Sequence, residues 1–243
     1  MADYSEFSFL SEPDKVKFKV FEHDVFQEGQ SGKVFMQSAE KMEKFLDDVQ
    51  EKYPLSKKRE EFLHSSYIRM AHEYRLWIER DVYEIEDKRL DNKAFSNSYK
   101  HARNLLVFCD KQLQETSDRD QKKRLFNKML VLCPKEKDED LMKLGEILMH
   151  LGDFMKPVEK VKLKDFRKSG TIEYDKDDIY ILSAHYSSLA YDMGRENGPA
   201  YQQMQEALNK IKKQSKIDDY MKKTINVRLG EFVDVWKERL AQR

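Results

Sequence analysis

The chain has 243 residues, of which 45 are basic and 45 acidic, so it carries no formal net charge. A balanced charge excludes the long-range positive field that collects nucleic acid or anionic lipid, so we expect neither partner. The chain contains only 8 Gly and 5 Pro, compared with 12 Tyr, 14 Phe and 11 Met. Turns are therefore few and apolar residues plentiful, which favours long helices over many short strands.

The cysteines and the apolar runs point to a protein without metal, cofactor or membrane span. Cys109 and Cys133 lie far apart, with no CxxC motif and no histidine at ligand spacing. No apolar run approaches the roughly 18 residues that a membrane span requires. The first residues, MADYSEFSFLSEPDK, lack the basic and then apolar order of a signal peptide. We therefore expect a soluble, cytoplasmic protein.

Residues 1–30 are predicted to be an N-terminal extension of uncertain structure, and residues 31–243 a single helical domain. The segment VKFKV at 16–20 alternates apolar and basic residues as a strand does. Phe21 and Val25, in contrast, continue with the spacing of a helix. The pattern leaves both alternatives open.

Helical spacing takes over after the GQSG turn. An apolar stripe predicts one helix from about residue 34 to 49, and a longer one, capped by Ser56, that continues to about residue 85. The segment 92–133 is also helical in pattern and is stopped by Pro134. It is either one helix that bends at the polar QETSDRDQKKR stretch or two helices that meet there.

The second half of the chain adds four more predicted helices. The first covers 138–155 and is disturbed by Pro157. The stretch 158–178 is highly charged and aperiodic, so it is either a frayed helix or a long excursion. Three final helices are predicted, at about 177–193, 199–213 and 218–243. The fold class is therefore all-α, an antiparallel up-and-down array of about nine helices without strand pairs.

No catalytic constellation is present, so the protein is predicted not to be an enzyme. The sequence contains no GxGxxG, GxxxxGK[ST], HExxH or GxSxG motif. His64 and His72 are eight residues apart but have no carboxylate partner at a defined spacing, and we interpret them as solvated or core residues. The acidic stretch at 81–87 lacks the ExxH pattern of a di-iron site and is interpreted as a solvated face.

Seven short blocks between about residues 33 and 240 resemble the 14-3-3 family in order and nearly in spacing. They are SAEKMEKFLDDV, LSKKREEFLHSSYIRMAHEYR, FCDKQL, LCPK, LGDFMKPVEK, AHYSSLAYDM and VRLGEFVDVW. The chain departs from the family in its N-terminal head and in extra residues around ETSDRDQKKRLF. The resemblance implies a 14-3-3-like array of helices, and an adaptor that binds phosphoserine or phosphothreonine segments of partner proteins in a concave groove.

The phosphate site that the resemblance implies is weakened. The family uses a lysine, two arginines and a tyrosine, which suit the several acceptors of a dianionic phosphate. The lysine falls on Ile68, with Arg69 beside it, and the first arginine falls on Arg75. The second arginine falls on Lys156, which lacks the planar fork, and the tyrosine falls on Pro157. Arg75, Lys156 and Arg69 are therefore the candidate phosphate ligands.

The implied peptide groove also differs from the family. The two asparagines that hold the peptide backbone fall on His185 and Phe232. His185 is able to donate to a peptide carbonyl in place of the first asparagine, although its charge varies near neutral pH. The expected groove wall is formed by Ile225, Arg228, Phe232, Val235 and Trp236.

Three functions remain open from the sequence. The first is the phosphopeptide adaptor; the second is a 14-3-3-like scaffold with an altered groove, binding unphosphorylated or acidic segments or its own terminus. A helical enzyme or a repeat adaptor is a third, which the missing motifs and the missing 34-residue repeat disfavour. Family members dimerise through their first helices, so a homodimer is expected, with Val34, Phe35, Met42 and the stretch 74–83 as candidate contacts. The alternative is that residues 1–30 cover this surface.

Overall fold

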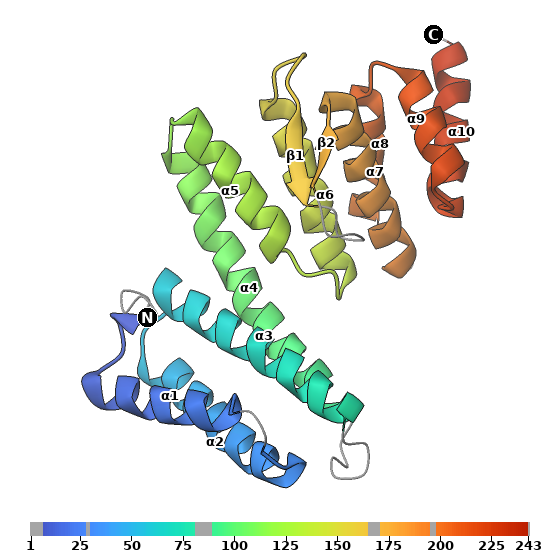
Figure 1. The fold of residues 1–243 in the computed structure, drawn as a ribbon. Helices are drawn as coiled ribbons and strands as arrows, with labels where there is room; N and C mark the ends of the chain where they lie inside the picture. The colour runs from blue at the N-terminus through green and yellow to red at the C-terminus, as the bar shows by residue number, and fades with distance from the viewer. Residues whose placement is uncertain (1–6, 28–29, 81–88, 165–170, 195–197, 243) are drawn as a thin grey trace. The chain divides into compact units, whose positions relative to one another are not determined.

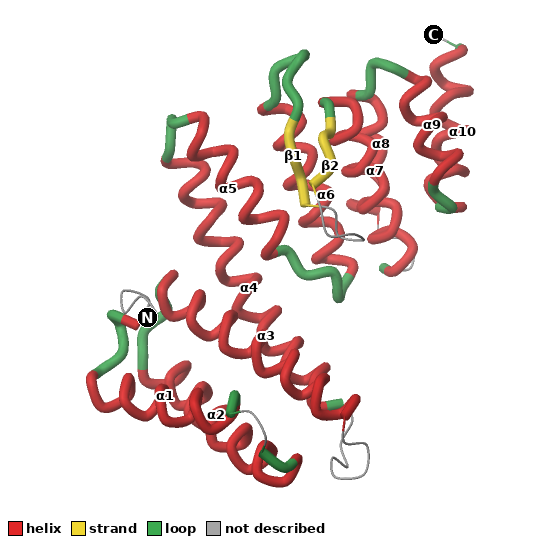
Figure 2. The backbone as a smooth tube through the Cα atoms, viewed as in Figure 1, coloured by secondary structure: helices red, strands yellow, loops and turns green. Residues whose placement is uncertain are grey.

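The computed structural model describes residues 7–27, 30–80, 89–164, 171–194 and 198–242. Within these residues the chain forms ten helices and two short strands (Figures 1 and 2). The prediction of a mostly helical chain is confirmed. The chain divides into two compact units, Met1–Phe108 and Cys109–Arg243, and each is described by itself.

The first unit is built from four helices. They are α1 (Glu12–Val25), α2 (Gly32–Lys52), α3 (Lys57–Arg80) and the greater part of α4 (Leu90–Glu115). Ser31 caps α2 and Ser56 caps α3, each by accepting a backbone N–H three residues on, at 3.4 and 3.3 Å. The cap at Ser56 is the predicted one. The predicted continuation of this helix to residue 85 and the acidic stretch 81–87 lie outside the described residues.

Helix α1 answers the question that the N-terminal pattern left open. Its apolar residues fall on two faces: Phe18 and Val25 are buried, whereas Val16 and Val20 are exposed. The strand-like alternation of VKFKV therefore reflects an exposed helix face that carries valines. Phe18 packs edge-on against Phe62 of α3, with ring centroids 4.8 Å apart, so α1 is part of the core of the first unit.

The apolar stripe of α2 supplies much of this core. Phe35 and Met42 are almost completely buried, and Tyr74 of α3 packs edge-on against Phe35 at 5.4 Å. Three of the residues expected to offer a dimer contact are thus covered within the unit. Val34, in contrast, keeps 48% of its surface exposed.

A buried carboxylate joins three helices of the first unit. Glu60 of α3 is fully buried and accepts hydrogen bonds from Arg59, from His101 Nδ1 at 2.8 Å and from Asn104 at 2.8 Å. Arg59 also donates to the backbone oxygen of Tyr53, just after α2, at 2.6 Å. Burial opposes ionisation, but these donors outweigh it and lower the pKa of Glu60 to about 2. The charged group is therefore fully satisfied inside the fold.

The second unit contains the remaining elements. They are the end of α4, α5 (Arg119–Leu132), α6 (Asp138–Phe154), β1 (Val161–Lys164), β2 (Thr171–Tyr174), α7 (Lys176–Met193), α8 (Gly198–Lys210), α9 (Gln214–Lys223) and α10 (Val227–Ala241). Helix α6 packs against α7, and α7 against α8. Two alternatives were left open for 92–133, and the structure shows the second: two helices meet there. Asp118 caps the second of them, α5, by accepting from the backbone N–H groups of Asp120 and Gln121.

The expectation of no strand pairs is wrong at one place. Strands β1 and β2, drawn in yellow in Figure 2, pair antiparallel within the stretch that the pattern left uncertain. Their sequences VKLK and TIEY alternate with period two, as strands do. Lys162 lies opposite Glu173, and their charged groups are 3.7 Å apart, which favours this register.

The last predicted helix is two helices. Asn226 interrupts it: its side-chain oxygen accepts from Leu229 N at 2.9 Å and so caps α10 after α9 has ended at Lys223. An asparagine favours this position because its side chain replaces the missing backbone acceptor. The described residues form ten helices, whereas about nine were predicted, and this break accounts for part of the difference. Among the described residues, no helix is both long and apolar enough to cross a membrane.

Candidate functional site

The two predicted cations of the first unit already have acidic partners. Arg69 donates to Glu22 of α1 at 2.5 Å and covers the ring of Phe26, 3.7 Å from its centroid. Arg75 is exposed and pairs with Glu79, one turn further along α3, at 3.2 Å. A phosphate bound at either residue would compete with a carboxylate.

The other two predicted ligands, Lys156 and His185, belong to the second unit. Lys156 is exposed in the turn after α6, and its backbone N–H donates to Glu159 at 3.0 Å. Glu159 also pairs with Lys123 and Arg119, each at 2.5 Å. The hydrogen bond from Lys123 and the backbone bond from Lys156 lower the pKa of Glu159 to about 2, against the opposing effect of burial. This carboxylate therefore fixes the turn that carries Lys156.

His185 has a positioning role that its sequence pattern did not indicate. Because the oxygen of Asn226 caps α10, its amide nitrogen is the donor to His185 Nδ1, at 3.1 Å, and to Ser188, at 2.9 Å. Nδ1 is then an acceptor, so the proton of the neutral ring is on Nε2. Through this bond, His185 on α7 orients the start of α10.

The five residues expected to form the groove wall lie in different surroundings. Ile225 is 99% exposed and Val235 is 39% exposed, whereas Trp236 is 6% exposed and belongs to the core of the second unit. Phe232 packs against the rings of Tyr191 and Tyr201. Arg228 pairs with Asp192 and Glu231. Trp236 and Phe232 are four residues apart, so one face of α10 carries both toward the core.

A cleft of about 440 Å³ opens where α6 ends, α7 begins and α8 passes into α9. We call it the lysine cleft. It is lined by Asp153, Pro157, Asp175, Lys176, Asp177, Tyr180, Asn209, Lys210, Lys212 and Lys213. Pro157 follows the predicted ligand Lys156 directly, so the cleft adjoins one residue of the predicted site.

The aspartates of the cleft are all bound by groups of the protein itself. Asp153 accepts from Tyr180 Oη at 2.7 Å and from Lys210 Nζ at 2.8 Å. Burial alone would raise the pKa of Asp153, but Lys210 and Tyr180 lower it. Asp175 caps α7 and pairs with Lys216 at 2.8 Å, and these contacts lower its pKa against the effect of burial. Both carboxylates are therefore held ionised and occupied.

Asp177 fixes the turn between α8 and α9. This buried carboxylate accepts from the backbone N–H groups of Lys212 and Lys213, at 3.3 and 3.0 Å. It binds the backbone of these residues and leaves their ammonium groups untouched. The two lysines are consequently held at the cleft by their main chain, with side chains that extend to solvent.

The lysines of the cleft differ in what they bind. Lys210 pairs with Asp153 and Glu206, and Lys176 donates to the backbone oxygen of Met155 at 3.0 Å. Lys212 and Lys213 are exposed, and in the part of the chain that the structure describes no acidic side chain pairs with either. With four lysines and three bonded aspartates, the lining presents unpaired positive charge. It is suited to an anionic ligand.

Comparisons with protein-family models, with curated proteins and with solved structures gave no match to this chain. The likeness to the 14-3-3 family therefore rests on the sequence blocks alone. Within the described residues, no group of three or more His, Cys, Asp or Glu side chains is placed to hold a metal ion.

The cleft was not predicted from the sequence, although the sequence contains a signal for it. The run KIKKQSKIDD places Lys212 and Lys213 at the end of the helix predicted for 199–213. Only the fold shows that Asp177, 35 residues earlier than Lys212, holds this turn.

Proposed function

We propose that the protein is a helical adaptor that binds acidic segments of partner proteins, phosphorylated segments included, in the lysine cleft. One observation carries the proposal: Lys212 and Lys213 are exposed at the cleft without a described acidic partner, while Asp153, Asp175 and Asp177 are bonded within the protein. In a chain without net charge, this is a local excess of positive charge at a concave surface.

The chemistry of the cleft favours acidic segments in general over phosphate alone. Its cations are lysines, which act as point charges and lack the planar fork with which arginine binds phosphate in bidentate fashion. The same conclusion follows from the resemblance, in which Ile68 and Pro157 replace two phosphate ligands. We expect a phosphorylated segment to bind more tightly than its unphosphorylated form because it carries more charge, and an acidic run without phosphate to bind as well.

The proposal also covers the fold family, the oligomeric state and the cellular role of the protein. The seven blocks that resemble the 14-3-3 family support a binding rather than a catalytic role, a 14-3-3-like arrangement of the helices, a homodimer and a place in cytoplasmic signalling. The ordered helices and the cleft support an adaptor.

The test is a calorimetric titration with three matched peptides that differ at one position, which holds serine, phosphoserine or glutamate within an acidic run. We expect phosphoserine to bind most tightly, and all three to bind less well as salt is raised, because the contacts are solvent-exposed. Equal affinity for a neutral peptide of the same length would contradict the proposal.

A double variant locates the binding. Lys212→Ala with Lys213→Ala is expected to weaken the affinity about tenfold, since exposed charge contacts contribute roughly 0.2–1 kcal/mol each. Lys222→Ala with Lys223→Ala removes the same charge from the end of α9, outside the cleft lining, and is the matched control. An equal loss in both double variants would show that overall charge, and not the cleft, binds the peptide.

A further inference from the structure

A small pocket between α8 and α10 adjoins the lysine cleft. It has a volume of about 50 Å³ and is lined by Gln205 and Asn209 of α8 and by Trp236, Arg239 and Leu240 of α10. Asn209 lines both the pocket and the cleft. A ligand that lies in the cleft therefore has the pocket next to it.

Trp236 brings an unsatisfied donor to this pocket. The side chain is 6% exposed, and its Nε1 is buried without a hydrogen-bond partner. An indole N–H only donates, so no proton shift can relieve it. Leaving a buried donor unpaired costs roughly 1–3 kcal/mol, which an acceptor bound at this position would recover.

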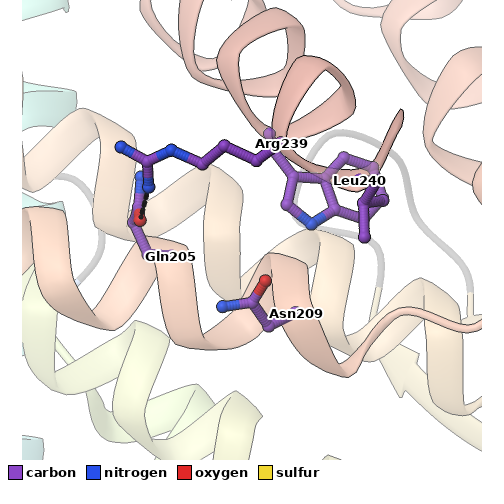
Figure 3. A pocket seen from close by; sticks show the side chains of 5 residues that line it. Gln205, Asn209, Arg239 and Leu240 are labelled. Carbon is purple, nitrogen blue, oxygen red and sulfur yellow. Dashed lines mark hydrogen bonds between the residues drawn. The ribbon is translucent and has the colours of Figure 1, made fainter. Parts of the chain in front are cut away.

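Two other polar groups of the pocket, Arg239 and Gln205, bind each other. Figure 3 shows the guanidinium of Arg239 beside Gln205, to which it donates at 3.0 Å. Gln205 in turn donates to Tyr201 Oη at 2.9 Å, so both ends of its amide are occupied. Arg239 has further N–H groups, and Asn209 is exposed. None of these groups accepts from the indole N–H in the described structure, and the charge of Arg239 favours an anionic ligand.

Its size restricts the ligand group. A cavity needs roughly 10–15 Å³ to hold one water molecule. A pocket of about 50 Å³ admits a group of about three heavy atoms, the size of a carboxylate. Arg239 and Leu240 are exposed, so the pocket is reached from the solvent side of α10.

We propose that the pocket of Trp236, Arg239 and Asn209 binds a carboxylate, namely the side chain of an aspartate or glutamate in a segment that occupies the lysine cleft. The indole N–H and the guanidinium of Arg239 each donate to a carboxylate oxygen, and Asn209 contacts the segment where cleft and pocket meet. This inference rests on the proposed function for the origin of the carboxylate. The pocket itself is testable without any peptide.

The direct test uses propionate, which has the end group of a glutamate side chain, and the indole N–H signals of the two tryptophans in a nitrogen-15 spectrum. Trp236→Phe assigns the signals, and Trp77 is the internal control. We expect propionate to shift the Trp236 signal downfield in a saturable way, and neutral propionamide at equal ionic strength to bind at least about tenfold more weakly. No saturable shift, or an equal response to sodium chloride, would overturn the proposal.

Two variants test the donors around the indole. Arg239→Gln is expected to weaken propionate binding about tenfold, whereas Arg124→Gln, which removes the same charge from an exposed position of α5 outside the pocket and the cleft, leaves it unchanged. Asn209→Leu should weaken binding of an acidic peptide more than binding of propionate. Equal propionate affinity in Arg239→Gln and in the parent would contradict the assignment of Arg239.

The peptide then separates this inference from the proposed function. Binding of the glutamate-containing peptide without movement of the Trp236 signal would overturn the pocket and leave the lysine cleft standing. A saturable response to propionate in a protein that binds no acidic peptide would support the pocket and reject the cleft as a site for protein segments.

Discussion

Glu60 in the first unit and the lysines of the cleft in the second both concentrate charge, but the two regions differ in what that charge binds. Glu60 is fully buried, and Arg59, His101 and Asn104 donate to it. At the cleft, the acids are bonded in the same way, whereas Lys212 and Lys213 are exposed without a described acidic partner. Charge serves the fold in the first region and is available to a ligand in the second.

The difference predicts opposite responses to mutation. Removing a partner from a buried, saturated network leaves other charged groups buried and unpaired, so stability falls. Removing an exposed lysine leaves nothing unpaired, so stability is nearly unchanged and only ligand binding suffers. Trp77 lies in the first unit and Trp236 in the second, so the fluorescence of each reports on the unfolding of its own unit.

The largest effect is expected from Glu60→Ala. It removes the carboxylate to which Arg59, His101 and Asn104 donate, and should lower the free energy of unfolding by about 3–5 kcal/mol. Urea unfolding followed by the fluorescence of Trp77, in a Trp236→Phe background, measures the first unit. Glu79→Ala, which removes an exposed carboxylate from the same helix, is the control and should cost no more than about 0.5 kcal/mol. Similar losses of unfolding free energy in both variants would contradict the expected difference between buried and exposed charge.

The contribution of Glu60 to stability should also depend on pH. The pKa of Glu60 is lowered from 4.5 to about 2 in the folded chain. A depressed carboxylate contributes its full stability above its unfolded pKa, so this contribution is lost as the pH falls from about 4.5 to about 2. Unfolding midpoints measured through this range should fall more steeply for the parent than for Glu60→Gln. Identical slopes would show that Glu60 does not contribute to acid stability.

A smaller effect is expected from Gly152→Ala, which tests how rigidly the cleft is built. An added Cβ would lie 2.6 Å from the ring of Tyr180, a ring that is buried and fixed by its bond to Asp153. The clash should cost about 1–3 kcal/mol and weaken peptide binding by displacing Tyr180. Gly198→Ala is the control, because nothing lies within 4 Å of its added carbon. An unchanged melting temperature in Gly152→Ala would mean that Tyr180 moves freely.

The smallest effect concerns the expected homodimer. Phe35 and Met42 are covered within the first unit, so Val34, which is 48% exposed, remains of the α2 residues named for that contact. Val34→Glu should raise the dimer dissociation constant about tenfold, whereas Val16→Glu on α1 should not change it. Sedimentation equilibrium measures both. A monomeric parent at high micromolar concentration would remove the dimer from the proposal.

Local pattern was enough for most of the helices, because apolar spacing and capping residues act over a few positions. Ser56 and its helix are an example, confirmed by the cap to Arg59 N. The same reasoning failed where a single residue decides the outcome, as at Asn226, whose cap divides the last helix. It also failed at β1 and β2, because two four-residue strands are too short to stand out from a charged stretch.

The candidate site was much harder to predict, because it depends on pairings between distant residues. Lys156 adjoins the lysine cleft and was named from the sequence, but nothing local indicates that Asp177 holds the turn at 212–213. Likewise, Trp236 was expected in a groove wall, and only the fold shows a buried indole with an unsatisfied N–H. Periodicity locates the elements, whereas the partners of charged groups follow from how the elements pack.

The difference between structural and available charge is tested by reversing the charge of the cleft. The proposal predicts that Lys212→Glu with Lys213→Glu reduces the affinity for the phosphoserine peptide at least about a hundredfold while the free energy of unfolding changes by less than about 1 kcal/mol. Lys222→Glu with Lys223→Glu, the same reversal at the end of α9, should change the affinity only slightly. Equal affinity in the parent and in the cleft variant would contradict the proposal that the protein binds acidic segments there.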